Sequence, residues 1–194
     1  MPLDLLLLGP PGAGKGTQAK RIAAERGIPQ IATGDILRAA MADGTELGRR
    51  VKPIYDRGDL VPDDLMVELI RERLSKDDTA GGFILDGFPR TIPQAEALDA
   101  MLGGLGRRLT AVLEFQLDSE EAFKRLVGRG AEENRSDDQP ETIRHRLKVH
   151  AEQAEPLAAY YLAQSILVGI DADRRVDEVY SDVEQVLERA EEHA

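Results

Sequence analysis

A glycine-rich loop directly after a short apolar segment constrains this chain more than any other feature. Leu3–Leu8 is apolar except for Asp4, and a helical pattern runs from about Lys15 to Arg26. Between them lies the stretch Gly9-Pro10-Pro11-Gly12-Ala13-Gly14-Lys15-Gly16-Thr17. Glycines let several backbone N–H groups converge on one phosphate, and the helix N-terminus and a lysine add positive charge. The sequence therefore predicts a strand, a phosphate-binding loop and a helix.

The phosphate loop implies a nucleoside triphosphate, bound by Gly12, Ala13, Gly14, Lys15, Gly16 and Thr17. In the general pattern a Ser or Thr follows the lysine, whereas here Gly16 comes between Lys15 and Thr17. We expect Thr17 to hold Mg²⁺ through water. Asp86 ends another apolar segment, and its carboxylate is expected to hold the water shell of the same ion.

Further short apolar segments predict the rest of the sheet. They are Gly82–Leu85, Ala111–Leu117 and Ile166–Ile170, with Gln30–Ala32 as a weaker fifth strand. Each is followed by a helix-like stretch, and unbroken apolar strands indicate burial on both faces. We therefore predict an α/β P-loop fold of three layers, with a five-stranded parallel sheet flanked by helices.

Helix starts are marked by residues that cap helices. Thr91 precedes Pro93, Ser119 precedes an acidic turn, and Asp138 precedes Pro140. The last helix is predicted from an apolar stripe between Val176 and Ala190.

Composition limits the function. The chain has 194 residues, enough for one domain, and a net charge of −11, which disfavours a broad nucleic-acid surface. No apolar run is long enough to cross a membrane, and no basic stretch precedes Leu5–Leu8 as in a secretory signal. The absence of cysteine excludes disulfides and thiolate zinc sites. We expect a cytoplasmic monomer with no structural zinc and no nucleic-acid or membrane partner.

The loop alone does not identify the class of nucleotide-binding protein. A guanine-specific switch needs an Asn-Lys-x-Asp element, but the only asparagine, Asn134, is followed by Arg135. Switches and ATP-driven interaction modules that lack that element remain an alternative at this point.

Two further segments carry a resemblance that covers nearly the whole chain. Thr33-Gly34-Asp35-Ile36-Leu37-Arg38 and Asp86-Gly87-Phe88-Pro89-Arg90-Thr91-Ile92-Pro93-Gln94 resemble the nucleoside monophosphate kinases, and adenylate kinase most closely. The resemblance implies Mg²⁺-dependent transfer of the γ-phosphoryl group of ATP to AMP. In relatives that act on UMP or CMP an Asn typically follows the Pro-Arg pair, so Thr91 favours AMP, with a UMP/CMP kinase as the runner-up.

By this resemblance, Arg38 and Arg90 clamp the α-phosphate of AMP, and Gln94 contacts the adenine edge. The implied AMP site consists of Thr33, Gly34, Arg38, Leu60, Val61, Gly87, Arg90, Gln94, Arg135 and Arg146. Two guanidinium groups from different segments suit a small dianion that must be oriented for in-line attack.

The resemblance extends to an arginine-rich lid. Arg125, Arg129, Arg135 and Arg146 match the family's catalytic or phosphate-binding arginines, together with Lys15 and Arg90. Arg125, Arg129 and Arg174 are also implied in binding ATP, the last in a segment similar to the one that contacts the ATP adenine. Gly130 replaces a second lid arginine of some relatives.

The resemblance implies one P-loop kinase domain over 1–194. Its core would comprise 1–32, 62–128 and 139–194, a small helical NMP-binding insert would comprise 33–61, and a short lid would comprise 129–138. Asp137 and Asp138 are expected either to orient lid arginines or, for Asp138, to cap the next helix. We expect His145 and His150 to be surface residues without a role.

Overall fold

The computed structural model describes residues 2–133 and 139–192. The five strands are β1 (Leu3–Leu8), β2 (Gln30–Ala32), β3 (Gly82–Asp86), β4 (Ala111–Gln116) and β5 (Leu167–Asp171). All pair in parallel, in the order β2-β3-β1-β4-β5. The predicted α/β fold with a five-stranded parallel sheet is confirmed, with strand ends differing by one residue in β3, β4 and β5.

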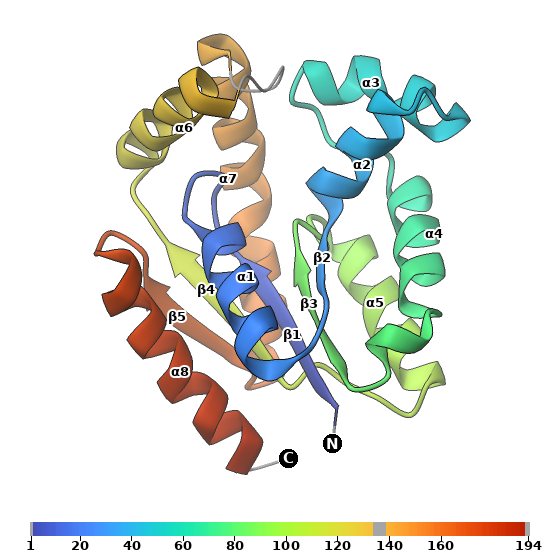
Figure 1. Cartoon of the computed structure of the whole chain (residues 1–194), viewed down its shortest axis with the longest axis vertical. Coiled ribbons are helices and arrows are strands. Elements are labelled where there is room, and N and C mark those ends of the chain that lie inside the picture. The colour runs from blue at the N-terminus through green and yellow to red at the C-terminus, as the bar shows by residue number, and fades with distance from the viewer. Residues whose placement is uncertain (1, 134–138, 193–194) are drawn as a thin grey trace.

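Helices cover both faces of this sheet (Figure 1). They are α1 (Lys15–Arg26), α2 (Thr33–Ala42), α3 (Glu46–Asp56), α4 (Asp63–Leu74), α5 (Ile92–Gly104), α6 (Ser119–Glu133), α7 (Pro140–Ala163) and α8 (Val176–Glu192), with a 3-10 turn at Asp77–Thr79. Within the described residues, no helix is both long enough and apolar enough to span a membrane.

Alternation along the strands builds two separate apolar cores. In β1, Leu6 packs into a core shared with α4, α5 and α7, whereas Leu5 and Leu7 pack into a core shared with α1 and α8. Because both faces of the central strands are buried, these strands are mainly apolar instead of alternating regularly with polar residues. This arrangement makes the three layers that the sequence predicts.

Asp4 is the exception in β1, and it is 1% exposed. Arg107, in the loop before β4, binds both carboxylate oxygens, with Nε 2.9 Å from Oδ2. Thr110 accepts a hydrogen bond from the backbone N–H of Asp4 over 3.0 Å. Burial raises the pKa of Asp4 in spite of the arginine. The ion pair with Arg107 allows the carboxylate of Asp4 to be buried in the sheet.

The helix starts follow the predicted signals with one correction. Thr91 caps α5 by accepting a hydrogen bond from the N–H of Gln94. α6 begins at Ser119 as expected, but the capping side chain is Asp118, which accepts from the N–H of Glu120 over 2.8 Å. A carboxylate at this position interacts favourably with the helix dipole. The expected cap at Asp138 lies outside the described residues.

Helices α2, α3 and α6 extend past the carboxyl ends of the strands. Helices α2 and α3 lie on one side, and α6 lies on the other (Figure 1). Helices α2 and α3 form most of the predicted insert 33–61. Helix α6 continues to Glu133, beyond Arg129, where the predicted lid begins. The loops that follow β1, β3 and β4 meet between α2 and α3 on one side and α6 on the other (Figure 1).

Candidate active site

A cavity of about 800 Å³ lies where the carboxyl ends of β1, β3 and β4 meet. This is the usual position of ligand sites in open parallel sheets. Most of the predicted site residues line it: Gly12, Gly14, Lys15, Gly16, Thr17, Gly34, Arg38, Leu60, Asp86, Gly87, Arg90, Arg125, Arg129 and Arg146. The structure thus brings together residues from six separate segments of the chain.

The phosphate loop forms one end of the cavity. Gly12 has a φ of +86°, and a Cβ there would lie 2.9 Å from the carbonyl oxygen of Ala122, so only glycine fits. Gly14 precedes the first turn of α1 in a left-handed conformation. Lys15 donates from Nζ to the carbonyl oxygens of Gly9 at 2.8 Å and Pro10 at 2.9 Å. The lysine is therefore held at the loop, within the same cavity as the arginines.

The ammonium group of Lys15 is destabilised by its surroundings. Burial lowers its pKa to about 8, Asp86 opposes this, and the positive charges of Arg90, Arg146 and Arg129 act in the same direction as burial. Such a concentration of positive charge in a protein of net charge −11 indicates a site for an anion.

Arg38 and Arg90 are two further cations that line the cavity. Arg38 lies on α2, folds over Gly34, and is bound by Tyr55 and by Asp35. Arg90 follows β3 and donates from Nε to the carbonyl oxygen of Gly87 over 2.9 Å. The two guanidinium groups come from different segments, as a clamp for a phosphate requires.

Gly87 allows these segments to approach each other. Its φ is +88°, and a Cβ would lie 2.6 Å from Oγ1 of Thr33. Thr33 is 1% exposed and donates to the carbonyl oxygen of Asp86 over 3.3 Å. Thr33 therefore joins the ends of β2 and β3 instead of lining the cavity.

Four other predicted residues also do not line the cavity. They are Ala13, Val61, Gln94 and Arg174. Ala13 and Val61 are buried, and Arg174 is paired with Asp171 and Asp182 at the surface. Arg135 lies outside the described residues.

Gln94 is buried, with 2% of its surface exposed. Its Nε2 donates to Asp63 over 2.7 Å, and its Oε1 accepts from the backbone N–H of Arg90 over 2.7 Å. Both ends of the amide are thus engaged within the protein. In this arrangement Gln94 fixes the loop that carries Arg90.

The arginines of α6 and α7 also line the cavity. Arg125 donates to the carbonyl oxygen of Ala172 at 3.0 Å and to Asp173 at 3.2 Å. It therefore ties α6 to the segment after β5. Arg129 and Arg146 line the cavity as predicted.

The residues expected near Mg²⁺ suit an ion that is bound mainly by a nucleotide. Asp86 and Thr17 both line the cavity, and an Asp86 oxygen would lie 3.6 Å from a Cβ placed on Gly16. Among the described residues, no three His, Cys, Asp or Glu side chains gather into a metal site. Mg²⁺ typically keeps several waters and takes one or two carboxylates together with substrate phosphates, which fits this pair.

His150 is not the exposed surface residue that the sequence predicted. This residue lines the cavity, and burial lowers its pKa to about 4, with Lys15 and Arg90 acting in the same direction. His145 is exposed as expected, and its Nε2 lies 2.7 Å from Oδ1 of Asp59. The signal for His150 was its spacing of four residues from Arg146, which places both on one face of a helix.

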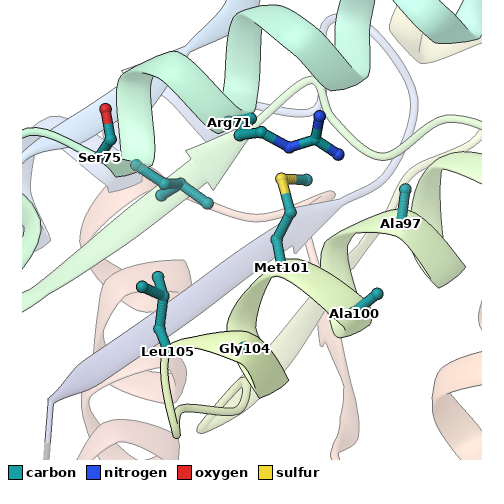
Figure 2. A pocket seen from close by; sticks show the side chains of 8 residues that line it. Arg71, Ser75, Ala97, Ala100, Met101, Gly104 and Leu105 are labelled. Carbon is teal, nitrogen blue, oxygen red and sulfur yellow. The ribbon is translucent and has the colours of Figure 1, made fainter.

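A second cavity, of about 460 Å³, lies between α4 and α5 (Figure 2). Met101 rises from α5 toward Arg71 of α4, and the other lining residues are mainly small or apolar. None of the predicted site residues lines this cavity. Its lining contains neither the phosphate loop nor the gathered arginines, so it is not the site that the sequence predicts.

A phosphate loop and further arginines from other segments in one cavity, on this parallel sheet, define a P-loop nucleoside monophosphate kinase. The chain belongs to the adenylate kinase family, whose sequence model matches residues 7–166. It is 51% identical over 177 residues to the adenylate kinase of Thermobifida fusca, covering 91% of this chain and 94% of the relative.

Two further relatives agree. The adenylate kinase of Phenylobacterium zucineum is 49% identical over 185 residues, which cover 95% of this chain and 97% of that protein. An adenylate kinase of Thermus thermophilus is 51% identical over 183 residues, which cover 94% of this chain and 96% of that protein. The resemblance inferred from the sequence is confirmed.

Proposed function

We propose that this chain transfers the γ-phosphoryl group of Mg²⁺-bound ATP to AMP and thereby forms two molecules of ADP. The observation that carries the proposal is one cavity lined both by the phosphate loop with Lys15 and by two guanidinium groups from other segments, Arg38 and Arg90. This number of cationic groups in one cavity suits a donor and an acceptor that both carry phosphates. The names of the relatives support AMP as the acceptor.

At the donor end, the backbone amides of the loop from Gly12 to Thr17 and the ammonium group of Lys15 bind the β- and γ-phosphates. Arg125, Arg129, Arg135 and Arg146 balance the charge that spreads over the transferred group. Phosphoryl transfer needs alignment and charge neutralisation more than covalent chemistry, so an arginine set without a nucleophile is sufficient.

At the acceptor end, Arg38 and Arg90 hold the α-phosphate of AMP so that one of its oxygens faces the γ-phosphorus. Gly34, Leu60 and Gly87 line the rest of this end. A guanidinium group forms two parallel hydrogen bonds with a phosphate, which fixes its orientation as well as its position.

Mg²⁺ enters with ATP, and Asp86 and Thr17 would hold it through its water shell. When bound, the ion neutralises charge on the β- and γ-phosphates. The protein's own part is to place a carboxylate beside the loop, where it also offsets the positive charge of Lys15.

Water must be excluded, because an open site would hydrolyse ATP. Adenylate kinases are a standard example of enzymes whose lid closes over the substrates. We expect the insert 33–61 and the lid 129–138 to provide this closure, and a single copy of the chain to form the whole site.

A coupled assay with Mg²⁺, ATP and each of AMP, UMP, CMP and GMP tests the proposal. We expect two ADP for each ATP and AMP consumed, and loss of activity when EDTA removes Mg²⁺. Faster turnover with UMP or CMP would instead indicate a pyrimidine monophosphate kinase. Slow ATP hydrolysis with no transfer to any acceptor would contradict the kinase assignment.

Arg90→Ala tests the acceptor clamp. We expect kcat/KM for AMP to fall by about 10³, within the range known for one arginine in phosphoryl transfer. Arg108→Ala is the matched control, because Arg108 is exposed and does not line the cavity. Near-normal turnover in Arg90→Ala would refute the clamp.

A further inference from the structure

His150 occupies a position in the cavity that the arginine set does not explain. It lies on α7 one helical turn after Arg146, and both side chains line the cavity. Residues four apart share one face of a helix, so α7 directs both groups toward the same space. His150 is half-buried, and the described part of the chain offers its imidazole no hydrogen-bond partner.

The charges around His150 are unfavourable for a cation in the free protein. Burial lowers its pKa to about 4, and Lys15 at the start of α1 and Arg90 after β3 act in the same direction. The other charged residues that line the cavity are Lys20, Asp35, Arg38, Asp59, Asp86, Glu114, Arg125, Arg129, Arg146 and Glu155. At neutral pH the ring is therefore uncharged, in a cavity that Lys15 and Arg90 also line.

We propose that His150 is a further phosphate-binding residue of this site, whose imidazole donates a hydrogen bond to the phosphates held near Lys15 and Arg90. This inference rests on the proposed function, since it needs a polyphosphate in the cavity. A neutral imidazole can donate from one ring nitrogen, and an imidazolium can donate from both.

Bound phosphates reverse the field at the ring. A nucleoside triphosphate brings several negative charges to the place where Lys15 and Arg90 now repel a proton. The ring then takes a proton from solvent, and its hydrogen bond becomes charge-assisted. Nucleotide binding is thereby coupled to proton uptake, and the bound state is favoured toward lower pH.

NMR of the histidine ring protons tests this directly. The chain has three histidines, so His145→Gln and His150→Gln assign their signals. In the free protein we expect the His150 signal not to titrate between pH 5.5 and 8. With Mg²⁺, AMP and β,γ-imido-ATP, its pKa should move into that range. A His150 signal that stays untitrated in the saturated complex would overturn the proposal.

Kinetics provide the second readout. His150→Phe keeps a ring but removes the donor, and we expect KM for ATP to rise by roughly 10- to 100-fold at pH 6.5, as for one charge-assisted hydrogen bond. His150→Gln keeps an N–H donor and should recover part of the loss. If His150→Phe kept the wild-type KM for ATP and the wild-type pH profile, the result would contradict phosphate binding by His150.

His145→Gln is the matched control, because it removes an imidazole from the same helix outside the cavity. It should retain the wild-type pH profile. The proposed function is checked separately by transfer to AMP in the unmodified protein. If that transfer failed, NMR titration with β,γ-imido-ATP alone would still decide whether His150 meets phosphate.

Discussion

Gln94 donates its side-chain amide to Asp63 over 2.7 Å, although 31 residues separate them. Asp63 also accepts a hydrogen bond from the hydroxyl of Thr91 over 3.0 Å. Because Gln94 accepts from the backbone of Arg90, one carboxylate on α4 fixes the loop that carries a phosphate clamp. A contact between Gln94 and adenine would require this amide to exchange its partner.

Asp63→Ala should therefore weaken both the fold and AMP binding. The substitution leaves the hydroxyl of Thr91 and the amide of Gln94 without their acceptor. Each unpaired donor should lower the unfolding free energy by about 1–3 kcal/mol. We expect KM for AMP to rise and KM for ATP to stay within about twofold, measured with urea unfolding and the coupled assay. Asp64→Ala, on the next residue of the same helix, should show only the small loss of a charge near a helix start. Equal effects of the two substitutions would contradict this role.

Arg125→Ala should raise KM for ATP by roughly tenfold or more and lower kcat. Arg125 ties α6 to Ala172 and Asp173 and lines the cavity, where we propose that it binds the phosphates of ATP. Loss of charge-assisted hydrogen bonds of this kind has an effect of this size. Lys124→Ala is the control, since that lysine is exposed and its ammonium group lies 3.7 Å from the carboxylate of Glu121, a long distance for an ion pair. An unchanged KM for ATP in Arg125→Ala would exclude the assignment.

The sequence was enough to predict the layers of the fold because local patterns determine them. Short apolar segments such as Gly82–Leu85, followed by helix-like stretches, indicate parallel strands wherever they pack. The strand order was not predicted, because it depends on which strands become neighbours. Nor did the pattern explain Asp4, whose partner Arg107 lies 103 residues away.

The same distinction holds for the site. The phosphate loop is one continuous segment, so its spacing predicts both its shape and the position of Lys15. The role of His150 depends on how α7 is rotated against the cavity, which tertiary packing decides. Gln94 was assigned by resemblance alone, and only the fold reveals that Asp63 and the backbone of Arg90 occupy its amide.

Affinity for ATP should fall as pH rises through about 8. Lys15 binds phosphate as an ammonium ion, and in the free protein its pKa is lowered to about 8. Above that pH, binding requires proton uptake, so affinity decreases by up to tenfold per pH unit. ATP itself does not titrate there. Calorimetry from pH 7 to 9.5 measures this, and Lys15→Met should bind weakly without the pH dependence.

Stability should change in the opposite direction over the same range. The unfolded chain retains the Lys15 proton up to its ordinary pKa of 10.5, whereas the folded protein releases it near 8. The unfolded state then binds more protons, so this lysine's contribution to the unfolding free energy rises with pH between about 8 and 10.5. Urea unfolding of wild type and Lys15→Met isolates the contribution. If the unfolding free energy of wild type minus that of Lys15→Met fell between pH 8 and 10.5, the result would contradict the lowered pKa of Lys15.

Asp4→Ala should destabilise the protein without changing the activity of the folded fraction. It leaves the guanidinium group of Arg107, which is 12% exposed, without its carboxylate, and breaking such a buried pair costs about 3–5 kcal/mol. Neither residue lines the cavity, so kcat and both KM values should stay unchanged. The double variant Asp4→Leu with Arg107→Met removes both charges together and should recover most of the lost unfolding free energy. If Asp4→Ala alone unfolded within about 1 kcal/mol of wild type, the pair would behave like an exposed ion pair, and the apolar packing around β1 would account for the stability of this part of the sheet.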